Sequence, residues 1–256
     1  MFLALTHIVT PNLGECQLTH RERQPINLAL ATRQHAAYCD TLRSHGLEVI
    51  ELDVNRDHPD SVFVEDTAVV VDEVAVMANP GAPSRQGEVT NMEPVLAKYR
   101  PIARIQPPVT LDGGDVLIVG KKVFVGLSTR TDRAGAEALR SILTPLGYRV
   151  TAVPVHGALH LKSAVTAVDK ATLLANPLWL DTTPFANFRI VPVAENEPWA
   201  ANALRLEDTV YLAKGFPATA AALSKLGYDV KAIDISELQK AEAGLTCSSL
   251  IFKKNR

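Results

Sequence analysis

Cys247 is the residue of this sequence whose type and position most directly point to chemistry. It lies in residues 244–249, ahead of a short apolar run, and a cysteine thiol is a strong nucleophile once it loses its proton. His160, Asp112 and the acidic pair at residues 65–66 stand at comparable positions ahead of other apolar runs. A thiol, an imidazole and carboxylates together form a nucleophilic site with its own acid–base catalyst. The sequence therefore predicts an enzyme, provided that the fold brings these side chains together.

A repeated pair of short strands follows these polar positions and predicts how they meet. Four predicted β-hairpins share short apolar strands around a tight turn: residues 67–71 and 74–77, 115–119 and 123–125, 164–168 and 171–175, and 203–206 and 209–212. A fifth hairpin begins at residues 248–252, but no return strand follows it. The N-terminal apolar residues 2–5 are therefore predicted to supply the missing strand, which would close the chain into a ring.

Helix-like stretches that end at a glycine connect the hairpins to further strands, as in a mixed α/β unit. Residues 146–150 and 226–230 are near copies of each other, and residues 45–49 are a looser copy, each with a glycine suited to the left-handed end of a helix. Self-similarity at roughly 40 to 50 residues is typical of repeat or propeller folds. A ring of this kind directs equivalent strand starts at a central axis: Asp66, Asp115, His160, Asn202 and Cys247. The alternative is chance similarity among hairpins rich in valine and alanine.

Composition limits the size of the fold and the kind of partner. The 256 residues are 47% hydrophobic and contain no linker-like stretch, so residues 1–256 are expected to form one domain. The net charge of −2 arises from 28 acidic and 26 basic residues that are interspersed, which disfavours nucleic acid and favours a small or zwitterionic ligand. No signal-like or membrane-spanning stretch is evident, so we expect no membrane association and a cytoplasmic location.

The three cysteines differ in their surroundings. An odd count without paired spacing argues against a disulfide framework and a cysteine-based zinc site. Cys39 lies beside the apolar stripe of a helix-like stretch and is expected to be a buried structural thiol. Cys16, in a polar loop, is expected to have no catalytic part. Cys247 alone stands at a repeat junction, where it is either a nucleophile or a small buried cysteine.

Six segments, in order along nearly the whole chain, resemble the dimethylarginine dimethylaminohydrolase family. These are residues 60–66, 80–85, 110–115, 126–131, 159–162 and 245–247. The resemblance implies a five-bladed β/α propeller of the guanidino-group-modifying (pentein) superfamily, built from pseudo-five-fold ββαβ repeats. It also implies hydrolysis of Nω-methylated L-arginine to L-citrulline and methylamine or dimethylamine through a covalent cysteine thiouronium intermediate. No metal or organic cofactor is expected, and the chain is expected to act as a monomer or homodimer.

The same resemblance implies roles for individual residues. Cys247 would be the nucleophile, His160 the general acid and base, and Asp112 the acidic partner. Positions that match substrate contacts are Leu18, Asp60, Glu65, Asp66, Arg85 and Arg130, together with Ala241 through its backbone. The sequence departs from the family at residues 240–244, where the family has an aspartate followed by glycine, and at Ala203, where a cysteine is common. These departures bear on which guanidine substituent is preferred.

The chemistry explains why such residue types are needed. A guanidinium carbon is a poor electrophile, and carboxylates that accept its N–H groups, predicted to be Asp66 and Asp112, would fix its plane and localise its charge. Arg85 and Arg130 suit an α-carboxylate, and Asp60 suits an α-amine. An acid at a blade start can also simply cap a turn or pair with a lysine, and this alternative stays open for Asp115, Lys162 and Glu65.

Activation of the thiol is expected to depend on the substrate. Nearby carboxylates keep a thiol protonated, whereas a bound cationic substrate and a protonated His160 favour the thiolate. His160 would then protonate the departing amine and later deprotonate the hydrolytic water, while the nearby His156 would take no part. Residues 14–20, followed by the charged residues 21–23, are either a mobile lid over the site or a disordered loop.

Two other functions remain open at this stage. The same thiol chemistry suits free arginine, citrulline or another alkylguanidine, because one methyl contact changes preference by only about 1–3 kcal/mol. A non-catalytic propeller, similar to the ribosome anti-association factor of the same superfamily, is the alternative from another class. That class has no need of a central cysteine, histidine and aspartate and favours a charged outer face, so the residues favour an enzyme.

Overall fold

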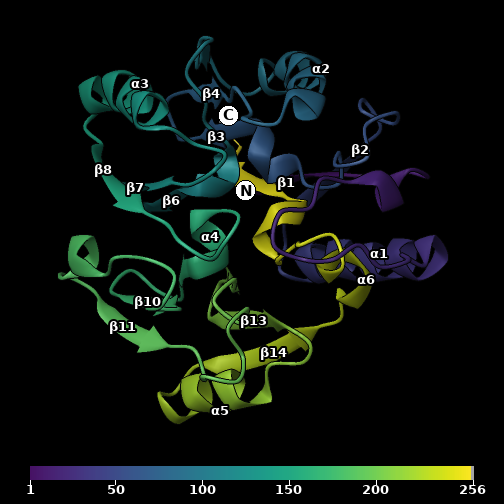
Figure 1. The fold of residues 1–256 in the computed structure, drawn as a ribbon, viewed down its shortest axis with the longest axis vertical. Coiled ribbons are helices and arrows are strands. Elements are labelled where there is room, and N and C mark those ends of the chain that lie inside the picture. The colour runs from purple at the N-terminus through teal and green to yellow at the C-terminus, as the bar shows by residue number, and fades with distance from the viewer. Residues whose placement is uncertain (255–256) are drawn as a thin grey trace.

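Five three-stranded sheets are arranged in a ring about a central axis (Figure 1). The structure is a computed structural model and describes residues 1–254. Each sheet consists of an antiparallel hairpin whose second strand also pairs in parallel with a third strand. The predicted five-bladed β/α propeller is therefore confirmed.

The strands agree with the predicted hairpins to within one or two residues. The blades contain β3 (Ala68–Val70), β4 (Ala75–Met77) and β5 (Ile102–Arg104); β6 (Val116–Val119), β7 (Lys122–Leu127) and β8 (Arg149–Pro154); β9 (Val165–Ala167), β10 (Thr172–Ala175) and β11 (Arg189–Pro192); β12 (Leu204–Leu206), β13 (Thr209–Ala213) and β14 (Asp229–Ile233); and β15 (Leu250–Lys253), β1 (Phe2–His7) and β2 (Glu48–Leu52).

The two ends of the chain meet in the last of these blades. Strand β15 pairs antiparallel with β1, with Leu5 opposite Leu250 and Phe2 opposite Lys253. The N-terminal segment therefore supplies the return strand that the fifth hairpin lacks, as predicted. Figure 1 accordingly shows both termini close together. Each three-stranded sheet keeps its own two edges, and the radial arrangement leaves these edges short.

Helices α1 (Leu28–Ser44), α2 (Gln86–Leu96), α3 (Arg133–Leu143) and α5 (Pro217–Lys225) lie on the outer rim of four blades (Figure 1). The glycines that follow three of these helical segments, Gly46, Gly147 and Gly227, have φ values of 73°, 82° and 91°, as the left-handed position predicts. The expectation of a helix in every connection was wrong for the blade of β9–β11. That connection contains Pro177 and Pro184, which disfavour a continuing helix, and forms only the 3₁₀ turn Thr183–Phe185.

Short helical turns precede the first strand of four blades and carry the polar residues toward the axis. They are the 3₁₀ turns Val64–Thr67, Gly113–Asp115 and Thr246–Ser248 and the single-turn helix α4 (Leu161–Ala164). Other short turns are Leu13–Glu15, Pro83–Arg85, Thr144–Leu146 and α6 (Ser236–Gln239). Four of the five residues that the repeat pattern predicted to converge lie in or next to these turns, and the fifth, Asn202, precedes β12.

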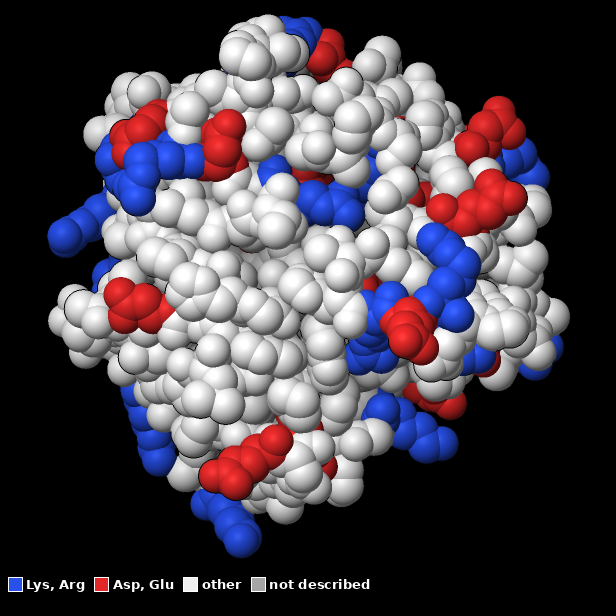
Figure 2. Space-filling model, in the orientation of Figure 1, with Lys and Arg blue, Asp and Glu red and all other residues white. Residues whose placement is uncertain are grey.

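Apolar side chains fill the spaces between neighbouring blades in several buried clusters. On the face seen in Figure 2, acidic and basic side chains are mixed, and no continuous region of one sign is visible. Among the described residues, no helix combines the length and the apolar character that crossing a bilayer requires.

Candidate active site

A small buried cavity lies near the axis, where residues from several blades meet. Its volume is about 20 Å³. The residues that line it come from the N-terminal loop, the segments before β3 and α4, the segments after β4 and β7, and the segment between α6 and β15: Gln17, Asp60, Phe63, Asp66, Arg85, Arg130, Leu159, His160, Ala241, Glu242, Ala243 and Cys247. The cavity therefore brings together the thiol, the imidazole and a carboxylate that lie far apart in the sequence.

Glycines allow this convergence because the backbones approach too closely for a side chain. A Cβ at Gly113 would overlap the carbonyl oxygen of Glu65, and a Cβ at Gly114 would overlap both Asp66 and His160. A Cβ at Gly244 would overlap the side chain of Asn202. The two adjacent glycines after Asp112 are thus required by the packing of the hub rather than by a turn.

His160 lies between two carboxylates. Its Nε2 is 3.0 Å from Oδ2 of Asp112, and its Nδ1 is 3.7 Å from Oδ1 of Asp66. Burial opposes protonation of the imidazole, but the Asp66 carboxylate and the hydrogen bond to Asp112 outweigh it and raise the pKa of His160 to about 9. At neutral pH the ring is therefore an imidazolium, the form that can donate a proton.

Asp112 contacts the imidazole of His160 but does not face the cavity. It is fully buried and does not line the cavity; Oδ2 contacts His160, and Oδ1 accepts a hydrogen bond from the Gly81 amide at 3.1 Å. The expected pairing with the imidazole is present. That Asp112 would also accept N–H groups from a guanidinium stays a prediction; Asp112 lies outside the cavity lining, whereas Asp66 belongs to it.

Asp66 faces the cavity and is held by fixed partners. Its Oδ1 accepts the Gly114 amide at 3.0 Å, and Oδ2 forms an ion pair with Arg85. Burial would raise its pKa, but His160 and Arg85 hold the pKa of Asp66 below its usual value. Asp66 is therefore an ionised carboxylate at the wall of the cavity, the group that a guanidinium requires.

Arg85 is buried among carboxylates. Besides Asp66, it pairs with Glu88 at 2.7 Å and donates to the carbonyl oxygens of Asp60 and Phe63. Its guanidinium therefore balances the charge of the acids in this part of the cavity wall. Arg130, by contrast, makes one side-chain hydrogen bond within residues 1–254, at 3.5 Å to the hydroxyl of Thr19, and is the less engaged of the two predicted cations.

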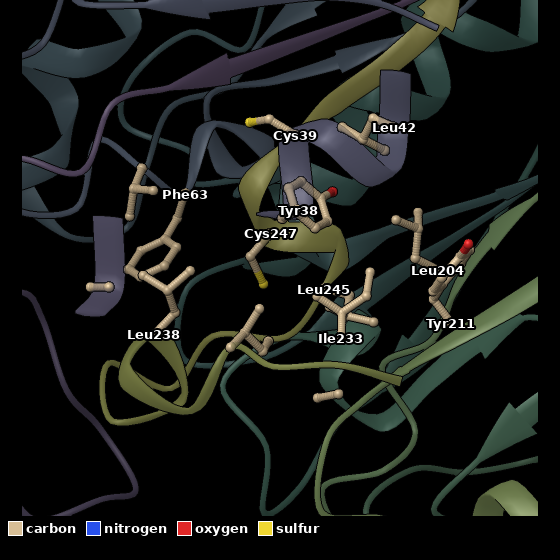
Figure 3. Packing of buried hydrophobic residues seen from close by; sticks show 14 of the residues in the cluster. Tyr38, Cys39, Leu42, Phe63, Leu204, Tyr211, Ile233, Leu238, Leu245 and Cys247 are labelled. Atoms are coloured by element: carbon tan, nitrogen blue, oxygen red, sulfur yellow. The ribbon is translucent and has the colours of Figure 1, made fainter. Parts of the chain in front are cut away.

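The surroundings of Cys247 keep its thiol protonated. Burial, followed by the carboxylates of Glu65 and Asp66, raises the pKa of Cys247 to about 12, and the Gly244 amide offsets this only in part by donating to Sγ at 3.4 Å. Figure 3 shows Tyr38 between Cys247 and Cys39 in the same apolar cluster. A thiol that is protonated without ligand is consistent with the expectation that a cationic substrate promotes its deprotonation.

This state of the thiol has a measurable consequence. We expect alkylation of Cys247 by iodoacetamide, followed by peptide mapping, to accelerate about tenfold per pH unit from pH 7 to pH 9, because the thiolate fraction grows in that proportion below the pKa. A cationic arginine analogue in the cavity should raise the thiolate fraction at neutral pH. A rate that levels off below pH 8 without ligand would contradict a strongly raised pKa.

Glu65 lies near Cys247 but is paired with a cation. It forms an ion pair with Lys162 at 2.5 Å and accepts the Thr246 hydroxyl at 2.8 Å. Glu65 does not line the cavity, so the lysine-pairing alternative describes its observed contacts. Asp115 likewise caps the blade, because it accepts the Ser128 hydroxyl at 2.7 Å and the Leu161 amide at 2.8 Å.

The N-terminal loop is ordered over the cavity. The Gln17 amide donates to both oxygens of Asp60, at 3.1 and 3.2 Å, and Leu18 packs on the adjacent apolar cluster without lining the cavity. Cys16, expected in a polar loop, is fully buried beneath it. The cavity has room for about one water molecule, which is less space than a ligand of amino-acid size needs.

Glu242 fastens this loop to the segment before Cys247. Its Oε1 accepts the backbone amides of Thr19, His20 and Arg21 at 3.0, 2.6 and 2.6 Å. The carboxylate is buried, and the backbone of Glu242 has a φ of 62°, a conformation that residues other than glycine rarely adopt. Arg21 also lies 4.6 Å from the ring centroid of Trp199. We call Glu242 the latch of the loop.

Removing the latch should loosen the loop. We expect Glu242→Gly, which relieves the backbone and deletes the carboxylate, to speed proteolysis within residues 17–24 and to lower kcat/KM about tenfold. Loss of even one bond to a charged acceptor costs about 1.5–3 kcal/mol, which corresponds to at least about tenfold. Glu207→Gly is a matched control, because Glu207 also has positive φ (52°) but lies on an exposed turn. Equal proteolysis of both variants would contradict the latch.

Sequence reasoning did not predict every residue of the cavity. It omitted Gln17, Phe63 and Glu242, and it left Asn202 without a function. Asn202 accepts the Thr246 amide at 3.0 Å and donates to the Thr246 hydroxyl at 3.1 Å, so it fixes the turn that carries Cys247. The position of Asn202 at a blade start was the available signal. For Glu242 the only signal was its proximity to Cys247 in the sequence.

Comparisons with known proteins point to one family. The family described as N,N dimethylarginine dimethylhydrolase, eukaryotic, matches residues 10–174. A protein of Streptomyces coelicolor named N(G),N(G)-dimethylarginine dimethylaminohydrolase is 41% identical over 252 residues, which cover 98% of this chain and 97% of the relative.

Two solved structures are also similar, each 31% identical over 98% of this chain and 100% of the other. One is the Pseudomonas aeruginosa dimethylarginine dimethylaminohydrolase, a cysteine-to-serine mutant complexed with citrulline, with a TM-score of 0.92. The other is a histidine-to-glycine variant of a dimethylarginine dimethylaminohydrolase as an adduct with S-methyl-L-thiocitrulline, with a TM-score of 0.93. The chain described here belongs to the dimethylarginine dimethylaminohydrolase family.

Proposed function

We propose that this protein hydrolyses Nω-methylated L-arginine to L-citrulline and methylamine or dimethylamine, with Cys247 as nucleophile. The observation that carries the proposal is the presence of Cys247, His160 and ionised Asp66 around one buried cavity, with Asp112 behind the imidazole. Family membership and the citrulline and thiocitrulline complexes of similar proteins support the same substrate class.

The guanidinium binds against Asp66, which localises positive charge on the side of the substrate next to it. The substrate cation also offsets the Glu65 and Asp66 carboxylates that keep the Cys247 thiol protonated, so the thiolate forms beside its target. Phe63 lines the cavity and suits the aliphatic chain of the substrate. Binding and activation of the nucleophile are thus coupled.

Two covalent steps complete the reaction. The Cys247 thiolate adds to the guanidinium carbon, and His160 donates a proton to the departing dialkylamine as the C–N bond breaks, which leaves a thiouronium bound to Sγ. Water then adds to the same carbon while His160 accepts its proton. The C–S bond breaks, the ureido carbonyl of citrulline forms, and the thiol is restored.

The amino-acid end of the substrate binds at the mouth of the cavity. Asp60, buried and with a pKa raised by burial to about 6, accepts the α-ammonium group once the Gln17 amide withdraws. Arg130 binds the α-carboxylate. The positive charge of Arg85 in the cavity wall also attracts this carboxylate. Leu18 and the Ala241 backbone contact the substrate when the loop closes, and Glu65 acts through Cys247 rather than by touching the guanidinium.

Product analysis tests the proposal. Purified protein incubated with asymmetric dimethylarginine should release citrulline and dimethylamine in equal amounts, quantified by mass spectrometry. Free L-arginine, which would release ammonia, should react far more slowly. Faster release of ammonia from arginine would instead assign a deiminase activity to the same cysteine, and the absence of citrulline from all guanidines tested would reject a hydrolase.

A further inference from the structure

Outside the active site, a second group of donor atoms lies between helix α1 and strand β2. His35 and Cys39 are one helical turn apart on α1, and Glu51 faces them from β2. Nδ1 of His35 is 3.5 Å from Oε2 of Glu51, and Sγ of Cys39 is 3.8 Å from the same nitrogen. None of these three residues lines the catalytic cavity.

The spacing of these atoms fits a bound metal ion. The 3.5 Å between His35 and Glu51 exceeds a good hydrogen bond. Zinc bonds of about 2.3 Å to sulfur and about 2.0–2.1 Å to nitrogen or oxygen separate tetrahedral ligand atoms by about 3.3–3.6 Å. The two distances from Nδ1 exceed these edges by roughly 0.2 Å. Because Sγ of Cys39 is also 4.0 Å from Nε2, the His35 ring must rotate about its Cβ–Cγ bond before a nitrogen lone pair and the thiolate point to one ion.

We propose that His35, Cys39 and Glu51 form a zinc site that ties α1 to β2. One thiolate, one imidazole and one carboxylate suit zinc, whereas magnesium and calcium prefer oxygen ligands alone. Burial lowers the pKa of His35, but the contacts with Cys39 and Glu51 outweigh burial and raise it to about 9. When the ion binds, the Cys39 thiol and the His35 imidazolium therefore each release a proton to solvent as the Sγ–Zn and N–Zn bonds form. Water completes the fourth position.

Burial and connectivity give the site a structural role. The thiol and imidazole are almost fully buried, but the Glu51 side chain is 42% exposed and leaves a path for the ion from solvent. Helix α1 connects the parallel strands β1 and β2 of the blade that closes the ring. A bound ion would therefore join the helix to the sheet of that blade and stabilise the folded state.

The test must separate this site from the active site, because Asp66, Asp112 and His160 form another group of possible ligands close to Cys247. Cobalt(II), a spectroscopic substitute for zinc, is titrated into metal-free Cys247→Ser protein. One equivalent should produce a near-ultraviolet thiolate-to-cobalt charge-transfer band that added zinc abolishes. The band should disappear in Cys247→Ser/Cys39→Ser and persist in Cys247→Ser/Cys16→Ser, whose replaced cysteine is also buried.

A substitution at the exposed ligand keeps the test decisive if the buried variants fail to fold. Glu51→Gln on the Cys247→Ser background should weaken cobalt binding at least about tenfold, and zinc should raise the Tm of the parent more than that of this variant. The proposal is overturned if the parent shows no thiolate band, if the band persists without Cys39, or if Glu51→Gln binds cobalt as tightly as the parent.

Discussion

The Cys247→Ser variant should lose at least about a thousandfold in turnover of dimethylarginine, because a hydroxyl in this environment cannot replace a thiolate as nucleophile. Binding should survive, since Asp60, Asp66 and Arg130 are unchanged. Stopped-flow and steady-state assays measure the rate, and isothermal titration measures the affinity. Intact-mass analysis after acid quench should find a substrate adduct on the native protein and none on the variant.

Cys39→Ser provides the matched control for the nucleophile. Cys39 belongs to the same apolar cluster as Cys247 and is also buried, but it lies on α1 away from the cavity. Its replacement should leave kcat close to the native value in assays without added metal. Retained activity in Cys247→Ser, or an adduct mapped to Cys16 or Cys39, would reject the assignment of the nucleophile.

Replacement of His160 should give the other large effect, a loss of about 10²–10⁴ in kcat that depends on the leaving group. In His160→Gly the departing amine has no proton donor, so dimethylarginine should turn over very slowly. S-methyl-L-thiocitrulline should still form the thiouronium adduct on Cys247, because the C–S bond to the methylthio group can break and methanethiolate can depart without a proton. The adduct should then persist, since no group deprotonates the hydrolytic water. Intact-mass analysis over time follows both steps.

His156→Gly is the control for the histidine, because His156 lies four residues away and is exposed. It should hydrolyse both substrates at the native rate. Rapid turnover of the thiocitrulline adduct in His160→Gly would show that another group activates water. Equal losses with both substrates would remove the proposed role of His160 as the acid for the leaving amine.

The repeat architecture could be predicted from the sequence because its signals are local. Alternating apolar residues mark the hairpins, and the glycines at 46, 147 and 227 mark helix ends by their backbone freedom. The pairing of residues 2–5 with the C-terminal strand follows from the unpaired fifth hairpin. Given a ring, the strand starts must point to one axis, so the convergence of Cys247 with His160 could be predicted as well.

The residues proposed to react were selected by residue type more than by position. A lone cysteine at a blade start, a histidine at another and an aspartate before two glycines carry their chemistry in their side chains. The missing helix between β10 and β11 was a failure of the same local reasoning. The prediction of a helix there followed the symmetry of the repeat and neglected the two prolines in the connecting segment.

Only the tertiary structure decided which partner each charged group has. Arg85 forms ion pairs with Asp66 and Glu88. Both carboxylate oxygens of Asp112 contact protein groups. Glu242 accepts hydrogen bonds from N-terminal residues that are more than 220 positions away in the sequence. Glu51 likewise meets Cys39 and His35 only because β2 packs beside α1. Such pairings depend on side-chain rotamers and on contacts between distant segments, which a local pattern of residue types does not encode.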